Sequence, residues 1–195
     1  MMRGMKSLFL LALAASVAVA GPAKPTKKYH FELTKVLVKP EVKADVGAAA
    51  QPRVEAQIKK AFADNPQLVA TLEGAPDPEI DHGQPYRKFL TKKGIAAAYL
   101  VTVEITEATE EVVPMEDKKG AQRLVVHVGI HVLGETIPGR TMGFTGDGQA
   151  TVKQEVGMKI RDKDRTYAWD GAAETAVGDA LKTCFEQLAK PQKKQ

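Results

Sequence analysis

The 195-residue sequence contains one cysteine, Cys184, and only 6% aromatic residues. One thiol cannot close a disulfide within a chain, so stability has to come from a packed core. The sequence also lacks a strong charge of one sign, with 28 basic against 24 acidic residues. Proteins that bind nucleic acid usually concentrate positive charge in one patch. We therefore predict no nucleic-acid partner, and nothing in the residue pattern indicates a cofactor.

Long apolar runs are also rare, and the one that exists lies at the N-terminus. Arg3 and Lys6 precede an uncharged stretch over 8–20, which at about 13 residues is shorter than the roughly 20 that span a bilayer. The stretch ends in the small residues of 18–20. A basic start, a short apolar middle and a small-residue exit are typical of a secretory signal peptide. We predict cleavage after Ala20 and a periplasmic or secreted mature chain with no transmembrane segment.

Composition divides the rest of the chain into three parts. Residues 21–28 contain two prolines and three lysines and are expected to be a flexible lead-in. Residues 29–190 carry the apolar patterns of one α+β domain, and residues 191–195 form a short basic tail. A chain of this length can bury a core of its own.

Three segments in the second half alternate apolar and polar residues, which indicates strands with one buried face. They cover 97–106, 123–133 and 140–153. The link over 134–139 is short enough for a hairpin, whereas the charged link over 107–122 is expected to be an exposed loop. We predict an antiparallel three-strand meander. Its inward residues would be Tyr99, Val101, Val103, Ile105, Val126, Val128, Ile130, Val132, Met142, Phe144, Ala150 and Val152.

The first half has shorter patterns. It predicts a strand over 29–38, a connection over 39–50, a helix over 51–66, a strand over 67–73 and a short helix over 86–94. Helical spacing of apolar residues then predicts a long helix that begins at Asp170 as its N-cap. The predicted fold class is α+β. Its antiparallel-rich sheet combines the meander with a strand–helix–strand unit, and the helices pack on one face.

His127 and His131 stand four residues apart, a spacing that brings two rings together on a helix. This segment is predicted to be a strand, where a rise of about 3.3 Å per residue puts their Cα atoms roughly 13 Å apart. Two ligands of one zinc ion need nitrogens about 2.0–2.1 Å from the metal. We predict no shared metal. The two interpretations left open are polar residues on a solvated face and a binding surface of groups that titrate near neutral pH.

Two further segments invite a functional interpretation. The glycines of 143–148 do not match a phosphate-binding loop, so Gly146 and Gly148 predict a bulge or bend in a strand. Residues 161–170 contain three aspartates but lack the glycine and glutamate of a calcium loop. We interpret them as a polar loop in which Tyr167 and Trp169 either anchor the following helix or form an exposed hot spot for a partner.

Candidates for catalysis are few. Cys184 lies on the apolar stripe of the last helix, where a buried thiol is ordinarily inert. Asp77, Glu79, Asp81 and His82 cluster in a proline-rich loop, where carboxylates are most often simply solvated. A hydrolase or metal-dependent enzyme that uses the 77–82 loop or the outward histidines is the alternative function, and it requires those side chains to converge in a pocket.

Residues 94–189 resemble the periplasmic domains of the CsgG and LpoB type from bacterial envelopes. The similarity rests on "GIAAAYLVTVEIT", on "RLVVHVGIHVLGETIPGRTMGFTGDGQATV" and on "AAETAVGDALKTCFEQL". In that family a strand of this type introduces a meander and an alanine-rich terminal helix covers the sheet. The lipid-bearing cysteine that follows the signal in those lipoproteins is missing here. The resemblance implies an envelope protein that works through contacts.

The leading hypothesis is an exported, non-enzymatic envelope protein that binds a protein or glycan partner. A third hypothesis is a homo-oligomeric structural component that associates through sheet edges or the outward sheet face. The proposed working surface is either the polar sheet face or the 161–170 segment. Its candidate binding residues are Thr102, Glu104, His127, His131, Thr145, Gln149, Tyr167 and Trp169.

Overall fold

The structure, a computed structural model, describes residues 26–190 except 117 and 119. The predicted signal peptide, its cleavage site and the basic tail lie outside the described residues. In chain order the elements are β1 (Lys28–Val38), α1 (Ala44–Asp64), a 3-10 turn (Ile80–Gly83), α2 (Gln84–Lys92), β2 (Ile95–Pro114), β3 (Gln122–Ile137), β4 (Met142–Val156) and α3 (Asp162–Ala189). No helix within the described residues is long and apolar enough to cross a membrane.

The four strands form one sheet in the order β1-β2-β3-β4. β1 pairs with β2 in parallel, while β2, β3 and β4 are consecutive antiparallel neighbours. The sheet is therefore mixed, and the prediction of an antiparallel-rich sheet was wrong. The cause is α1, which carries the chain back across the sheet after β1 so that β2 starts from the same end.

The predicted strand over 67–73 is absent from the sheet. This segment makes a single bridge, between Leu68 and Tyr29. The Tyr29 N–H donates to the Gln67 carbonyl and the Val69 N–H donates to the Tyr29 carbonyl, both at 2.8 Å. Since β2 occupies the place beside β1, the strand–helix–strand unit closes through β2. The 67–73 segment only touches the free edge of β1.

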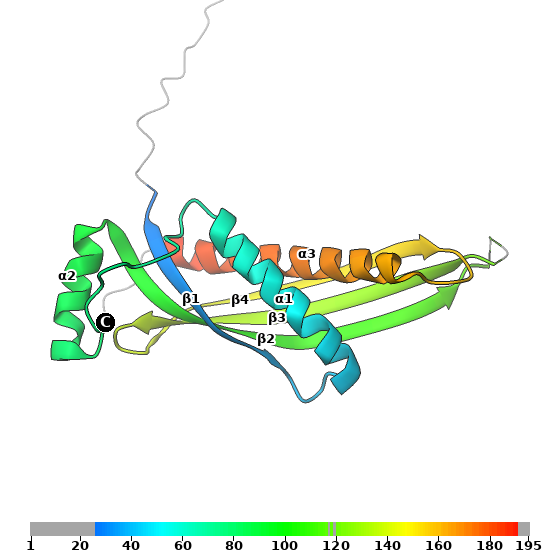
Figure 1. Cartoon of the computed structure of the whole chain (residues 1–195), viewed down its shortest axis with the longest axis horizontal. Helices are drawn as coiled ribbons and strands as arrows, with labels where there is room; N and C mark the ends of the chain where they lie inside the picture. The colour runs from blue at the N-terminus through cyan, green and yellow to red at the C-terminus, as the bar shows by residue number, and fades with distance from the viewer. Residues whose placement is uncertain (1–25, 117, 119, 191–195) are drawn as a thin grey trace, which may run out of the picture.

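α1 and α3 cover one face of the sheet, here called the inner face. Figure 1 shows α3 running along the sheet and α1 crossing it obliquely. The alternating residues of β2 and β3 point into this layer, and Val101, Val103, Ile105, Val126, Val128 and Val132 are all fully buried. Period-two patterning therefore predicted the core of these two strands correctly. Met142 is the exception among the predicted inward residues, because it is 57% exposed.

α2 departs from the prediction that the helices pack on one face. Its Tyr86 and Leu90 form a second apolar cluster with Ala98 of β2 and with Ile137 of β3. Ala98 alternates with the inward Tyr99, so this cluster lies on the opposite side of the sheet. We call that side the outer face, and α2 covers only one end of it (Figure 1).

Gly146 and Gly148 serve α3 rather than a bend in β4. The register of β4 against β3 is unbroken at both positions. A Cβ atom on Gly148 would collide with the carbonyl oxygen of Ala176, and one on Gly146 would collide with that of Ala180. The two glycines therefore let the alanine-rich stripe of α3 approach the sheet backbone closely.

Two helices begin earlier than the sequence predicts. α1 starts at Ala44 and contains Pro52 in its interior, and α3 starts at Asp162 rather than at Asp170. The carboxylate of Asp164 accepts the Arg161 backbone N–H at 3.2 Å and two guanidinium N–H groups at 2.8 and 2.9 Å. The hydrogen bonds from the Arg161 side chain lower the pKa of Asp164. This cap stabilises the first turn of α3.

The link over 107–122 is also shorter than predicted. β2 continues to Pro114 and β3 begins at Gln122. The charged residues 107–111 are therefore part of the sheet and pair with β3. Their acidic side chains become part of both sheet faces, which matters for the candidate site.

Candidate functional site

The outer face of β2, β3 and β4 carries the polar residues that alternate with the core. At its centre β2 contains a β-bulge, because the register with β3 shifts between Ile105 and Glu107. Gly129 of β3 lies opposite, where a Cβ atom would stand 3.2 Å from both Thr106 Oγ1 and Glu107 Cβ. Gly129 lines a hollow of about 250 Å³, and the lining also includes Asp147 and Gln149 of β4. Bulges of this kind re-aim side chains beside functional sites.

The two outward histidines flank this hollow, which we call the glycine hollow. His127 Nε2 lies 3.0 Å from Glu107 Oε2, and its Nδ1 lies 2.9 Å from Thr151 Oγ1. His131 Nδ1 lies 2.6 Å from Asp147 Oδ1. Since a carboxylate only accepts, Nε2 of His127 and Nδ1 of His131 carry the donated protons. Each imidazole thus fixes one carboxylate beside Gly129.

The carboxylates themselves remain open to solvent. The Glu107 side chain is 67% exposed and that of Asp147 is 80% exposed, whereas His127 and His131 are 22% and 27% exposed. The two carboxylates line the hollow, while the less exposed imidazoles hold them from outside its lining. Among the described residues, no group of three or more His, Cys, Asp or Glu side chains is placed to hold a metal ion. This geometry offers hydrogen-bond acceptors and negative charge to a cationic group.

Thr102, Glu104, Thr145 and Gln149 lie on the same outer face but play different parts. The Thr102 hydroxyl lies 3.0 Å from the Thr34 hydroxyl, and Glu104 forms an ion pair with Lys39 at 2.8 Å. Both therefore tie β2 to β1 or to the residues that follow it. Gln149 lines the glycine hollow, and Thr145 pairs with Leu133 of β3 further along β4.

The 161–170 segment is helical and does not form an exposed aromatic cluster. Trp169 is buried at 3% exposure and its Nε1–H donates to Glu110 Oε2 at 2.8 Å. Arg165 Nε donates to the other oxygen of Glu110 at 2.8 Å. Tyr167 alone points outward, with 69% exposure. The interpretation of Trp169 as part of an exposed hot spot is therefore wrong, and its role is to join α3 to β2.

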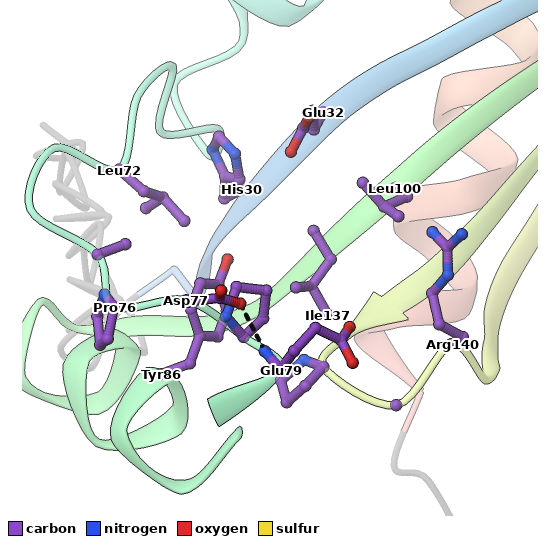
Figure 2. Close-up of a pocket in the computed structure, with 14 residues that line it drawn as sticks. His30, Glu32, Leu72, Pro76, Asp77, Glu79, Tyr86, Leu100, Ile137 and Arg140 are labelled. Atoms are coloured by element: carbon purple, nitrogen blue, oxygen red, sulfur yellow. Dashed lines mark hydrogen bonds between the residues drawn. The ribbon is translucent and has the colours of Figure 1, made fainter. Parts of the chain in front are cut away.

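A cavity of about 510 Å³ lies at the end of the outer face that α2 partly covers. Figure 2 shows its lining, which comes from β1, β2, the 72–79 segment, α2 and the turn between β3 and β4. We call it the end cavity. Its lining residues are His30, Glu32, Leu72, Ala75, Pro76, Asp77, Pro78, Glu79, Tyr86, Leu100, Ile137, Pro138, Gly139 and Arg140.

The structure divides the acidic loop proposed for the alternative enzyme. Asp77 and Glu79 line the end cavity, and the Glu79 N–H donates to Asp77 Oδ1 at 2.8 Å. Asp81 and His82 lie in the following turn, both exposed and both with positive φ, at 47° and 52°. His127 and His131 lie beside the glycine hollow, where they contact Glu107 and Asp147. The structure therefore places these side chains at three separate locations, whereas the enzyme hypothesis required them to share one pocket.

Cys184 is fully buried on the side of α3 that faces the sheet. Burial raises the pKa of its thiol to about 12. The thiol is therefore protonated near neutral pH, and thiolate chemistry is not available at this position.

Sequence reasoning missed several of the residues that line the glycine hollow and the end cavity. Glu107 lies in the link that was predicted to be a loop, and Asp147 was interpreted only as part of a glycine-rich segment. Alternation within 140–153 could have placed Asp147 outward, two residues from Thr145. Nothing in the local pattern could have joined His30, Tyr86 and Arg140, because three separate elements bring them together.

The protein is an α+β domain. It has a four-stranded mixed sheet, helices over the inner face and a largely polar outer face that carries the glycine hollow and the end cavity. No protein-family model matches the chain, and no curated protein matches it. Solved structures do match along most of the chain.

Three of these solved structures illustrate the similarity. A homolog of the neuraminyllactose-binding hemagglutinin from Helicobacter pylori matches with TM-score 0.44 and 8% identity, over 85% of this chain and 89% of that one. The minor lipoprotein of Acinetobacter baumannii matches with TM-score 0.39 and 11% identity, over 85% and 98%. Rare lipoprotein B of Shewanella oneidensis matches with TM-score 0.39 and 8% identity, over 82% and 96%. None of the three is a CsgG or LpoB protein, so that resemblance stays a prediction.

Proposed function

We propose that this chain is an exported envelope protein that works by contact, and that it docks a basic segment of a protein partner on the glycine hollow. The observation that carries the proposal is the pair of exposed carboxylates, Glu107 and Asp147, held by imidazoles on either side of Gly129. A lysine or arginine side chain could enter the space above the glycine and meet both carboxylates.

The charge of this surface favours a protein over a neutral glycan. Charge-assisted hydrogen bonds to carboxylates are about twice as strong as neutral ones. The fixed imidazole partners reduce the side-chain entropy that the carboxylates would otherwise lose on binding. The open position of the hollow fits docking better than catalysis, since active sites are generally concave and exclude water.

Export follows from the sequence pattern of residues 1–20 and can be tested by itself. We expect protein recovered from the periplasm or the medium to begin at Gly21, as read by N-terminal sequencing. A chain that stays in the cytoplasm with Met1 or Met2 at its start would contradict the export part of the proposal.

Docking can be tested by placing a photo-crosslinking residue at the hollow. Gln149→p-benzoylphenylalanine puts the probe on the lining, and Glu186→p-benzoylphenylalanine puts it on the exposed side of α3 as a matched control. We expect an adduct of defined mass from position 149 and not from position 186. Adding Glu107→Lys and Asp147→Lys should abolish it, while adding Glu186→Lys should not.

Two outcomes would overturn the proposal that a partner docks on the glycine hollow. One is the absence of any adduct at 149, and the other is an adduct whose yield is insensitive to the double charge reversal. If the adduct has twice the mass of the chain, the partner is a second copy. Sedimentation of the purified protein would then show whether that copy binds stably.

A further inference from the structure

We propose that the end cavity binds a primary ammonium group carried on a short apolar stem. This site is separate from the glycine hollow and does not depend on the docking function, because no residue lines both. The ligand class is a small organic cation, and the argument rests on charge, on unused polar groups and on the apolar lining.

Carboxylates outnumber cations around the end cavity. Glu32, Asp77 and Glu79 line it, and Arg140 is the one lining side chain with a permanent positive charge. The Arg140 Nε stands 3.7 Å from Glu135 Oε2, so part of its charge is already offset outside the cavity. A cation gains from this imbalance and an anion loses by it. Figure 2 shows these acidic side chains reaching the cavity from β1 and from the 72–79 segment.

Two nearly buried polar side chains line the same space. His30 is 7% exposed, and its Nδ1 lies 2.7 Å from the Val69 carbonyl oxygen. A carbonyl oxygen only accepts, so Nδ1 donates and the lone pair of the neutral ring is on Nε2. The structure shows no hydrogen-bond partner for Nε2 among the described residues. His30 therefore offers an unused acceptor.

Tyr86 provides the second unused group. It is 4% exposed and lines the cavity, yet its hydroxyl has no hydrogen-bond partner in the part of the chain that the structure describes. Burial, and then the negative charge of Glu32, raise the pKa of Tyr86. The hydroxyl therefore stays neutral and able to accept. The hydroxyl oxygen is not among the buried side-chain atoms that lack a partner, so it opens onto the cavity, where a ligand donor can reach it.

An ammonium group has three N–H donors and needs three acceptors. Carboxylate oxygens of Glu32 or Asp77, the Tyr86 hydroxyl and His30 Nε2 supply acceptors of the right kind. Leu72, Leu100 and Ile137 provide apolar surface for a stem of a few carbons. The volume of about 510 Å³ lies within the range of pockets for small ligands.

The first test compares three probes of equal length by calorimetry on the purified protein. Pentylamine supplies the ammonium, pentan-1-ol is its neutral match and pentanoate is its anionic match. We expect pentylamine to bind at least about tenfold more tightly than pentan-1-ol, and pentanoate to show no heat. Equal binding of the amine and the alcohol, or no binding of the amine, would overturn the proposal.

The second test uses charge variants whose effects have opposite signs. Glu32→Gln removes one carboxylate and should weaken pentylamine binding about tenfold, whereas Arg140→Gln removes the opposing cation and should strengthen it severalfold. Glu186→Gln on α3 is the matched control and should change nothing. Circular dichroism verifies that each variant is folded. A merely structural role of Arg140 cannot produce tighter binding, so an Arg140→Gln variant that binds no better would contradict the assignment.

Discussion

In β2, β3 and β4 the same strands supply both faces of the sheet, but the side chains on the two faces differ in character. On the inner face most side chains are apolar and buried beneath α1 and α3. On the outer face the alternating positions carry histidines, carboxylates and threonines joined across strands. Burial of apolar area stabilises the inner face, whereas the outer pairs exchange water contacts for protein contacts at little net gain. The outer face is therefore free to carry function.

The largest difference should appear when adjacent residues of β4 are truncated. Phe144 is 2% exposed and its ring lies 5.0 Å from those of Phe31 and Tyr99. Phe144→Ala should lower the free energy of unfolding by about 4 kcal/mol because it opens a cavity. Thr145→Ala, on the other face, should cost less than about 1 kcal/mol. Urea denaturation followed by circular dichroism measures both, and equal losses would break the comparison.

The close approach of α3 to β4 predicts the next largest effect. Gly148→Val places branched atoms where the backbone of Ala176 lies, so we expect a loss of about 3 kcal/mol from overpacking. Gly178 lies in the same helix, and a Cβ atom added there would have nothing within 4 Å of it. Gly178→Ala should therefore stabilise the protein by about 0.5–1 kcal/mol. Thermal unfolding of the two variants should shift in opposite directions.

One carboxylate lies on the inner face, and its replacement should have an intermediate effect on the free energy of unfolding. Glu110 is 21% exposed and accepts hydrogen bonds from both Trp169 and Arg165. Glu110→Gln replaces one acceptor by a donor and should cost about 1–2 kcal/mol. The neighbouring Glu111 is exposed on the outer face, and Glu111→Gln is the matched control. Tryptophan fluorescence during urea unfolding should separate them, and identical midpoints would refute the role of Glu110.

The outer pairs should contribute little to stability. His131→Ala removes the contact with Asp147 and should cost less than about 1 kcal/mol at pH 7. The same variant leaves Asp147 without its fixed partner and should reduce crosslinking from position 149. A loss of stability as large as that of Phe144→Ala would mean that the outer face is structural.

The smallest effect should come from the cap of α3 and should depend on pH. The pKa of Asp164 is lowered in the folded protein by the Arg161 side chain. A depressed folded pKa contributes stability above the unfolded value and loses it as the pH falls through the folded value. Asp164→Asn should therefore be less stable than the natural chain at pH 7. The difference should shrink below about pH 4. A difference that is constant from pH 7 to pH 3 would contradict this reasoning.

Local patterns predicted the elements whose signals do not depend on other parts of the chain. The alternation over 97–106 and 123–133 lies within β2 and β3, and the inward residues of both are in the core. The last helix was predicted to begin too late. The polar residues Asp162, Lys163 and Arg165 interrupt the apolar pattern that continues in its first turns with Ala168 and Trp169. Polar residues at a helix start can face solvent while the turn is held by a cap.

The candidate site was predictable only in part. Alternation placed His127 and His131 outward, but their partners Glu107 and Asp147 come from two other strands. Which residues meet across strands depends on register, and register here depends on the bulge at Thr106. The prediction of a strand over 67–73 was wrong because its short apolar pattern does not show how far the segment runs alongside β1, where it makes a single bridge between Leu68 and Tyr29.

The sequence by itself determined that the sheet has one apolar and one polar face. Side chains alternate across a strand, and the apolar ones are buried away from water because of the hydrophobic effect. The sequence also determined that the apolar stripe on the last helix would pack against that apolar face. Only the tertiary structure decided that β1 runs parallel to β2, that α2 lies on the polar side and that His30, Tyr86 and Arg140 surround one cavity. These contacts join residues far apart in the chain, and their energies depend on the whole arrangement rather than on any local pattern.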